Sequence, residues 1–141
     1  MNIYEHIYRV FKSSWGIYIK IIAEYTAMSA YEDKNSCSEI CIGLWATYAK
    51  QPLSMENKPV EEDKSFIWDG LKKVSKQIIT NSPYNADTLV VIHAIEISLC
   101  DFQQEGLTPA IIEWASKAFN FEAPNVGVSY NKQLNKYEFT Y

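Results

Sequence analysis

The chain has 141 residues, 48% of them hydrophobic, and its formal net charge at pH 7 is −4. This length fits a single domain with its own core, and the apolar content excludes a disordered chain. Only one of the thirteen basic residues is an arginine, Arg9. Because arginine is the main reader of phosphates and bases, this composition argues against direct nucleic-acid binding and favours a basic partner.

The N-terminal segment carries charged residues and no apolar core, so we expect no secretory leader. The most apolar window, residues 15–31, contains Lys20 and Glu24, and we therefore expect no membrane-spanning helix. An odd number of cysteines excludes a complete disulfide framework. These features predict a soluble cytoplasmic protein that does not act at a membrane.

The first thirty residues predict helix. Large apolar side chains recur there at steps of three and four residues, which is the spacing of one helix face. Gly16 interrupts the stripe, so we expect one long helix or two collinear helices that end near Glu32. The stripe consists of Tyr4, Tyr8, Phe11, Trp15, Tyr18, Ile22, Tyr25 and Met28.

Two further helices are expected on either side of an acidic loop. The first begins near Ser38, and Pro52 ends it. The second spans about 64–80 and ends at the turn-forming sequence TNSPYN. The loop between them, residues 51–63, has two prolines and four acidic residues against one lysine, so we expect it to be exposed.

Residues 88–100 fit two structures. Their β-branched side chains favour a strand, in which His93 would be buried. Apolar residues from Leu89 to Phe102 nevertheless step by three and four, and the segment ends at Gly106, a residue type that often follows a helix. We therefore predict a helix here. Its less apolar side carries His93, Glu96, Cys100 and Gln103.

The C-terminal third predicts a helix followed by a hairpin. Thr108 caps the helix, and Pro109 occupies its first position. Apolar residues then alternate on both sides of the polar link NKQLNK, which indicates two strands. The expected fold class is α+β in one domain, residues 1–141. It is mainly helical, with four to six helices, and a C-terminal antiparallel β-hairpin packs on the helices. The alternating side chains are Val126, Val128, Tyr130, Tyr137, Phe139 and Tyr141.

The segment HAIEISLCDFQQEG, residues 93–106, comes closest to a reactive site. On a helix, His93 and Glu96 lie one turn apart and could share a metal ion, but no other segment supplies a matching pair. Cys100 would lie two turns from His93, too far for a direct hydrogen bond. A histidine on the flank of an amphipathic helix is the simpler interpretation, so we expect no catalytic residue, metal or cofactor. The alternative is a small metal- or Cys/His-dependent hydrolase that uses His93 and Glu96.

Acidic side chains concentrate in the second half of the chain, where residues 87–122 contain six acids and one lysine. Any soluble domain has charged faces, but this asymmetry suits electrostatic capture of a basic protein, with Tyr or Trp side chains as anchors. The carboxylates expected to bind such a partner are Glu96, Asp101 and Glu105, followed by Glu61, Glu62 and Asp63.

In its size, acidity, aromatic content and lack of a reactive constellation, the chain resembles bacterial toxin-immunity proteins, including those of contact-dependent growth inhibition. This resemblance concerns the profile of the whole chain. It implies an inhibitor that binds a cognate toxin, often a nuclease, and blocks it without turnover. Carboxylates would then take the place of the phosphates in the toxin's substrate. A different hypothesis is an adaptor or self-associating protein that uses the N-terminal aromatic helix through Tyr4, Tyr8 and Trp15.

Overall fold

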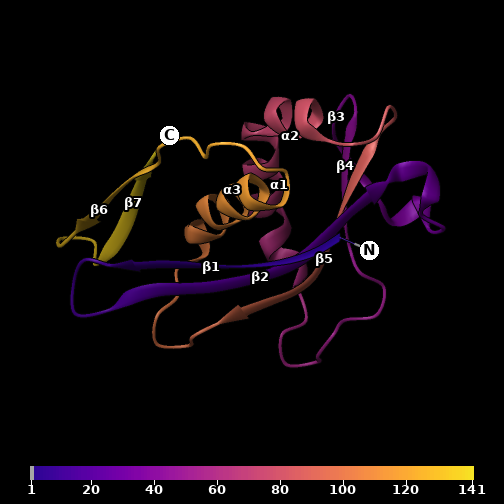
Figure 1. The fold of residues 1–141 in the computed structure, drawn as a ribbon. Helices are drawn as coiled ribbons and strands as arrows, with labels where there is room; N and C mark the ends of the chain where they lie inside the picture. Colours follow the sequence, from indigo (N-terminus) through magenta and orange to yellow (C-terminus); the bar gives the residue numbers. More distant parts are fainter. Residues whose placement is uncertain (1) are drawn as a thin grey trace.

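The computed structural model describes residues 2–141 and shows a five-stranded sheet with its helices on one face (Figure 1). The strand order is β1-β2-β5-β4-β3, and β4 runs parallel to β5 while the other neighbours are antiparallel. Strands hold 37% of the residues and helices 29%, so the prediction of a mainly helical fold is wrong. The strands are β1 (Asn2–Phe11), β2 (Gly16–Ala27), β3 (Ser38–Cys41), β4 (Leu44–Tyr48), β5 (Thr88–Ile97), β6 (Gly127–Asn131) and β7 (Lys136–Thr140).

The helices lie in two places along the chain. α1 and α2 belong to the crossover between the parallel strands β4 and β5, and α3 follows β5. The predicted helix over 64–80 is confirmed, with a break at Val74, and so is the helix near Thr108. No helix within residues 2–141 has both the length and the apolar composition to cross a membrane. The helices are α1 (Lys64–Lys73), α2 (Ser75–Asn81) and α3 (Leu107–Ala118), with short 3-10 turns η1 (Met28–Ala30), η2 (Lys34–Ser36), η3 (Glu61–Asp63) and η4 (Gln104–Gly106).

The N-terminal segment that was predicted to be helical is the β-hairpin of β1 and β2. A step of four residues keeps a strand on one face and a step of three changes the face, so the stripe mixes both faces of the hairpin: Tyr8 is buried, whereas Phe11 is 74% exposed. In β2 the alternating side chains Ile17, Ile19 and Ile21 are buried under the helices. Gly16 lets the hairpin close, because a Cβ there would clash with the backbone oxygen of Val10. The N-terminal aromatic helix proposed for an adaptor is therefore absent.

Two other predicted helices are strands as well. The segment that begins near Ser38 forms β3 and β4 around a turn at Gly43, whose φ is +99°. Residues 88–100 contain β5, the central strand, whose first five residues are all buried. The helices cover one face of β5, and the loop after β4 lies beside the strand, where Ile95 N donates to Asn57 O (3.0 Å). Consecutive residues such as Leu89 and Val90, which point to opposite faces, are both fully buried. A strand that is buried on both faces loses its alternation, and this made a helix seem the better fit.

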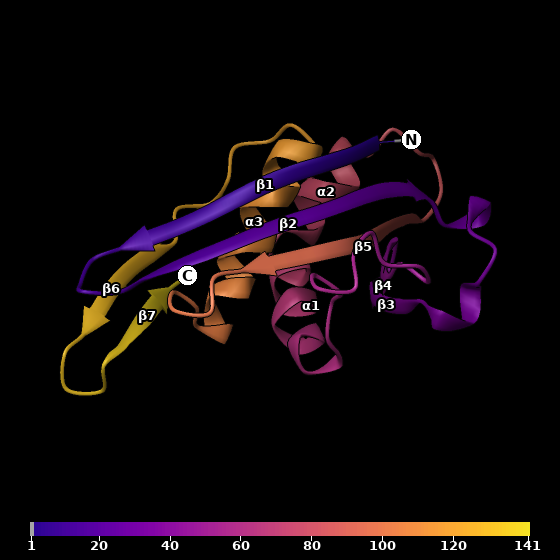
Figure 2. The same ribbon diagram turned by 90° about the horizontal axis from the view of Figure 1, so that it is seen from below.

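The predicted C-terminal hairpin is confirmed as β6 and β7. Its side chains Val128, Tyr130 and Phe139 pack against the core. Tyr137 is fully buried, and its hydroxyl donates to the backbone oxygen of Trp15 (2.6 Å) in the turn between β1 and β2. The hairpin is thereby held at one end of the long strands, as Figure 2 shows.

Burial of tyrosines makes stability sensitive to alkaline pH. Burial raises the pKa of Tyr25 to about 12, with a further contribution from Tyr4, and burial also raises the pKa of Tyr8 and Tyr48. An unfolded tyrosine ionises near pH 10. A raised folded pKa means that folding favours the neutral phenol, so this stability is complete below about pH 10 and is lost as the pH rises through about 12. Absorbance of ionised tyrosine against pH should show a late fraction that titrates together with loss of circular dichroism. A single titration near pH 10 in folded protein would contradict this.

Gly70 sets the distance between α1 and α3. A Cβ at Gly70 would clash with Ile111 Cγ2 and would lie 2.7 Å from Thr108 O. Because the second contact is with backbone, Gly70→Ala should lower the free energy of unfolding by about 1–3 kcal/mol, despite the better helix propensity of alanine. The matched control is Gly127→Ala, whose Cβ would lie 3.5 Å from Thr140 Cβ, and its effect should stay within about 0.5 kcal/mol. Urea denaturation followed by circular dichroism compares the two, and equal midpoints would refute this close approach.

Candidate functional site

The structure separates the three carboxylates that were expected to form one binding patch. Glu96 lies on the sheet face opposite the helices, where its cross-strand neighbour is Lys20. Asp101 lies in the loop after β5 and turns inward: its Oδ1 accepts a hydrogen bond from Gly16 N (3.0 Å). Glu105 belongs to η4, on the helical side of the sheet. The expected patch therefore does not form, because the three residues lie in a strand, a loop and a 3-10 turn, and no helix brings them together.

The acidic loop before α1 lies beside Glu105. Gln104 Nε2 donates to Glu62 O (3.2 Å) and to Asp63 Oδ1 (2.9 Å), which joins η4 to η3. Glu61 forms an ion pair with Lys64 (3.0 Å). The predicted carboxylates Glu62 and Asp63 thus lie near Glu105, because Gln104 binds both of them. No sequence pattern predicts this contact, since the two segments are about 40 residues apart.

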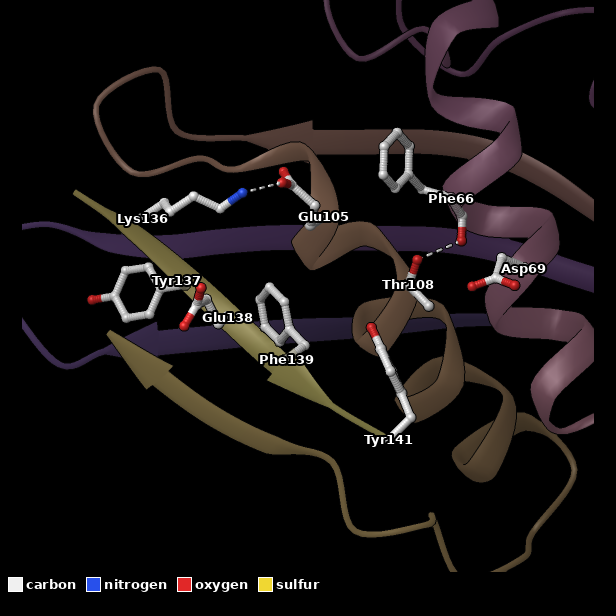
Figure 3. A pocket seen from close by; sticks show the side chains of 9 residues that line it. All are labelled: Phe66, Asp69, Glu105, Thr108, Lys136, Tyr137, Glu138, Phe139 and Tyr141. Atoms are coloured by element: carbon white, nitrogen blue, oxygen red, sulfur yellow. Dashed lines mark hydrogen bonds and ion pairs between the residues drawn. The ribbon is translucent and has the colours of Figure 1, made fainter. Parts of the chain in front are cut away.

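An open cleft of about 530 Å³ lies next to this acidic loop, between α1, α3 and β7 (Figure 3). We call it the β7 cleft. Three carboxylates, one lysine and four aromatic rings line it, so it combines negative charge with flat apolar surface. Its lining residues are Phe66, Asp69, Glu105, Thr108, Lys136, Tyr137, Glu138, Phe139 and Tyr141.

The charges of the β7 cleft are only partly compensated. Glu105 Oε2 lies 3.3 Å from Lys136 Nζ, and both side chains are 43% exposed. Asp69 Oδ2 lies 3.7 Å from Lys73 Nζ, and that ammonium also sits over the ring of Tyr141, 4.6 Å from its centroid. Because such exposed pairs contribute little in water, a partner's cations can replace them at small cost.

The hydroxyl of Tyr141 remains a hydrogen-bond donor at neutral pH. Burial raises its pKa, and the negative charge of Asp69 raises it further. The cleft therefore offers a phenolic donor and an aromatic face next to carboxylates, which is the mixture that recurs at protein-binding surfaces.

Hydrogen bonds fix the walls of the cleft. The side-chain amide of Gln103 clamps the backbone of Tyr137, donating to its carbonyl oxygen and accepting from its N–H, both at 2.7 Å. Across the cleft, Thr108 Oγ1 donates to Phe66 O (2.8 Å) and ties α3 to α1. These bonds hold the hairpin and the helices in one arrangement, so the cleft exists before any partner binds.

Sequence reasoning found Glu105 but missed Asp69 and Glu138. Asp69 lies within α1 among lysines, and Glu138 lies in a strand whose neighbours were expected to pack on helices. The aromatic alternation of β7 was the one usable signal, because it placed Phe139 and Tyr141 on one face. Nothing in the sequence shows that α1 and β7 meet.

The two histidines each meet a carboxylate, on opposite faces of the sheet. His93 Nε2 lies 3.6 Å from Glu24 Oε1, so its partner is not Glu96, and both of its ring nitrogens are buried without a hydrogen bond. His6 Nε2 lies 2.7 Å from Glu113 Oε1. Within residues 2–141, no three His, Cys, Asp or Glu side chains are grouped as metal ligands. Neither imidazole lines the β7 cleft.

Comparisons with protein-family models, with curated proteins and with solved structures find no match to this chain. The resemblance to immunity proteins therefore stays a prediction, and the function is inferred from the geometry of the site.

The inward position of Asp101 predicts a structural role. Asp101→Ala removes the acceptor of Gly16 N and should lower the free energy of unfolding by about 1–2 kcal/mol. Asp101→Asn keeps an oxygen acceptor and should restore about half of that loss. Glu96→Ala, which removes a carboxylate from the open sheet face, should change stability by less than about 0.5 kcal/mol. Chemical denaturation measures all three, and an Asp101→Ala variant as stable as the wild type would exclude this role.

Proposed function

We propose that this protein is a binding protein that captures a basic segment of another protein in the β7 cleft and inhibits it without chemical turnover. The observation that carries the proposal is the gathering of Asp69, Glu105 and Glu138 around aromatic rings in one open cleft. Lysine and arginine side chains of a partner could pair with these carboxylates, and their stems or neighbouring apolar side chains could lie on the rings.

The acidic loop enlarges the negative surface toward one side of the cleft. Gln104 holds Glu62 and Asp63 next to Glu105, so an approaching cation meets acidic side chains before it reaches the cleft. The negative electrostatic potential of these side chains speeds association with a basic partner, while buried contacts with aromatic rings slow the dissociation of the complex. This division suits an inhibitor that must find its target quickly and hold it.

In its specific form, the proposal is that the partner is a cognate bacterial toxin, in the simplest case a nuclease, met in the cytoplasm. A nuclease binds phosphates through a basic surface, and carboxylates can occupy that surface in place of the phosphates. The overall acidity of the chain supports this form, and so does the single arginine, because neither favours direct binding of nucleic acid.

A charge-reversal comparison tests the proposal. Tagged wild-type protein, the Glu105→Lys/Glu138→Lys variant and a control Glu32→Lys/Glu39→Lys variant, whose sites lie outside the acidic loop, are used to retain proteins from an extract of the native host. The control changes the net charge equally, at exposed carboxylates outside the β7 cleft. We expect one basic protein to be enriched by the wild type and the control, and its affinity for the cleft variant to fall at least about tenfold. Equal enrichment by all three would show that the cleft is not the binding site.

Two further readouts separate binding from immunity. Circular dichroism of the cleft variant should match the wild type, which excludes misfolding as the cause of lost binding. Expression of the captured protein in a bacterial host should arrest growth, and co-expression of the wild type should relieve the arrest. A captured protein without any growth effect would refute the toxin form of the proposal and leave binding in the cleft standing.

A further inference from the structure

β1 is a long strand at the edge of the sheet. Within residues 2–141 no strand pairs with its outer side, although residues 122–126 line an open pocket together with residues 8–12. β1 has ten residues and pairs with β2 without any register shift. The opposite edge strand, β3, has four residues and a register shift, which are common protections against strand addition. Among residues 2–141, β1 forms backbone–backbone hydrogen bonds only with β2. One regular edge of the sheet is therefore available for another strand (Figure 2).

The register shows which backbone groups of β1 are free. Tyr18 N donates to Asp101 O on the β5 side, so even-numbered residues of β2 turn their backbone toward β5 and odd-numbered ones toward β1. The odd-numbered residues of β2 pair with even-numbered residues of β1, as Ile19 does with Tyr8. The free N–H and C=O groups therefore belong to the odd-numbered residues of β1. These are Ile3, Glu5, Ile7, Arg9 and Phe11.

The side chains of the same residues lie on the sheet face away from the helices. Three of them are apolar and remain partly or largely exposed: Ile3 at 44%, Ile7 at 42% and Phe11 at 74%. Between them stand one acid, Glu5, and one base, Arg9. Along this edge the side chains are, in order, apolar, acidic, apolar, basic and apolar, and Ile7 is the central one.

This order is complementary to itself when the strand is reversed. We propose that β1 pairs antiparallel with β1 of a second copy, about a two-fold axis at Ile7, to form a dimer with one continuous sheet. In this register Glu5 of each copy faces Arg9 of the other, Ile3 faces Phe11, and the two Ile7 side chains face each other. All of these are odd-numbered residues, so the free backbone groups also meet in hydrogen-bonded pairs.

Other registers lose the charge match. A shift by two residues places Glu5 opposite Ile7 or Phe11, and Arg9 opposite Ile3 or Ile7. A shift by four places two Glu5 or two Arg9 side chains against each other, which is unfavourable for directly opposite pairs. Only the register centred on Ile7 pairs opposite charges and apolar side chains throughout.

Two features of the single copy are completed by this pairing. Arg9 lies over the ring of Tyr18, 5.2 Å from its centroid, and no carboxylate within residues 2–141 forms an ion pair with it. On the helical face, the register sets Tyr8 across from His6, whose Nδ1 is buried without a hydrogen-bond partner. A second copy supplies Glu5, which within one copy pairs with Lys20 (2.9 Å), to the guanidinium and places a tyrosine across from His6.

Sedimentation equilibrium of the full chain tests the dimer. The wild type should sediment with twice the monomer mass of 16.2 kDa. Glu5→Arg and Arg9→Glu should each weaken dimerisation by about tenfold or more, because each converts two symmetric attractions into repulsions. The combined E5R/R9E variant should dimerise again, since it exchanges the charges and restores their match. Glu39→Arg on β3 alters net charge as Glu5→Arg does and should leave the dimer intact.

Amide hydrogen exchange gives a readout within the strand itself. Amides of Glu5, Ile7 and Arg9 should exchange more slowly as protein concentration rises, whereas amides of Tyr8 and Val10, already bonded to β2, should not change. A wild type that stays monomeric at millimolar concentration would overturn the proposal, and so would a dimer that both single variants leave unaffected. An E5R/R9E variant that remains monomeric while it is folded would refute the register. This interface shares no residue with the β7 cleft, so the result of these tests does not depend on whether the proposed function is correct.

Discussion

The packing of α3 against the inner face of β1 and β2 is the interaction on which the rest of the structure depends. Nine of the twelve residues of α3 are buried, among them Trp114, which also donates a hydrogen bond to Tyr4 O (3.0 Å). α1 approaches α3 closely at Gly70, so the position of the second helix follows from that of the first. The preceding turn, η4, is drawn against Ile17 and Ile19, and this brings Glu105 to the helical side of the sheet.

The β7 cleft is a product of this arrangement and of one polar clamp. Hydrophobic contacts hold the β6–β7 hairpin near the end of the long strands, but contacts of this kind have little directional preference. The amide of Gln103 and the hydroxyl of Tyr137 supply direction, since both bind backbone groups at fixed geometry. The charged side chains of the cleft are therefore presented by a rigid scaffold and not by a loose C-terminal extension.

Net charge alone gives little guidance to the binding surface, because internal contacts engage several carboxylates. Asp101 binds Gly16 N, and Asp87 accepts a hydrogen bond from the indole of Trp45 (2.9 Å). Glu24 and Glu113 lie against the two histidines. The three carboxylates of the β7 cleft also have internal partners, namely Lys73, Lys136 and Asn131, but these contacts are exposed and a partner's cations can replace them at small cost. The edge of β1 is a different kind of surface. Its one acid, Glu5, and its one base, Arg9, are spaced so that each would face the other in an antiparallel second copy.

The sequence by itself determined the helices near 64–80 and Thr108, and the hairpin after residue 125. The helices have a one-sided apolar pattern and the hairpin has a polar turn, so local physics and tertiary packing agree. The predicted cap is wrong, because α3 begins at Leu107 and Thr108 lies inside it, bound to Phe66 O. The sequence also singled out Glu105, whereas most of the aromatic side chains lie in the core or pack against it. Tertiary structure alone decided that residues 2–11, 16–27 and 88–97 are strands, because large apolar side chains lie on both faces of the N-terminal hairpin and a doubly buried strand shows no alternation. It alone decided that Asp69, Glu105 and Glu138 share one cleft, since contacts between distant segments arise from core packing and leave no local pattern.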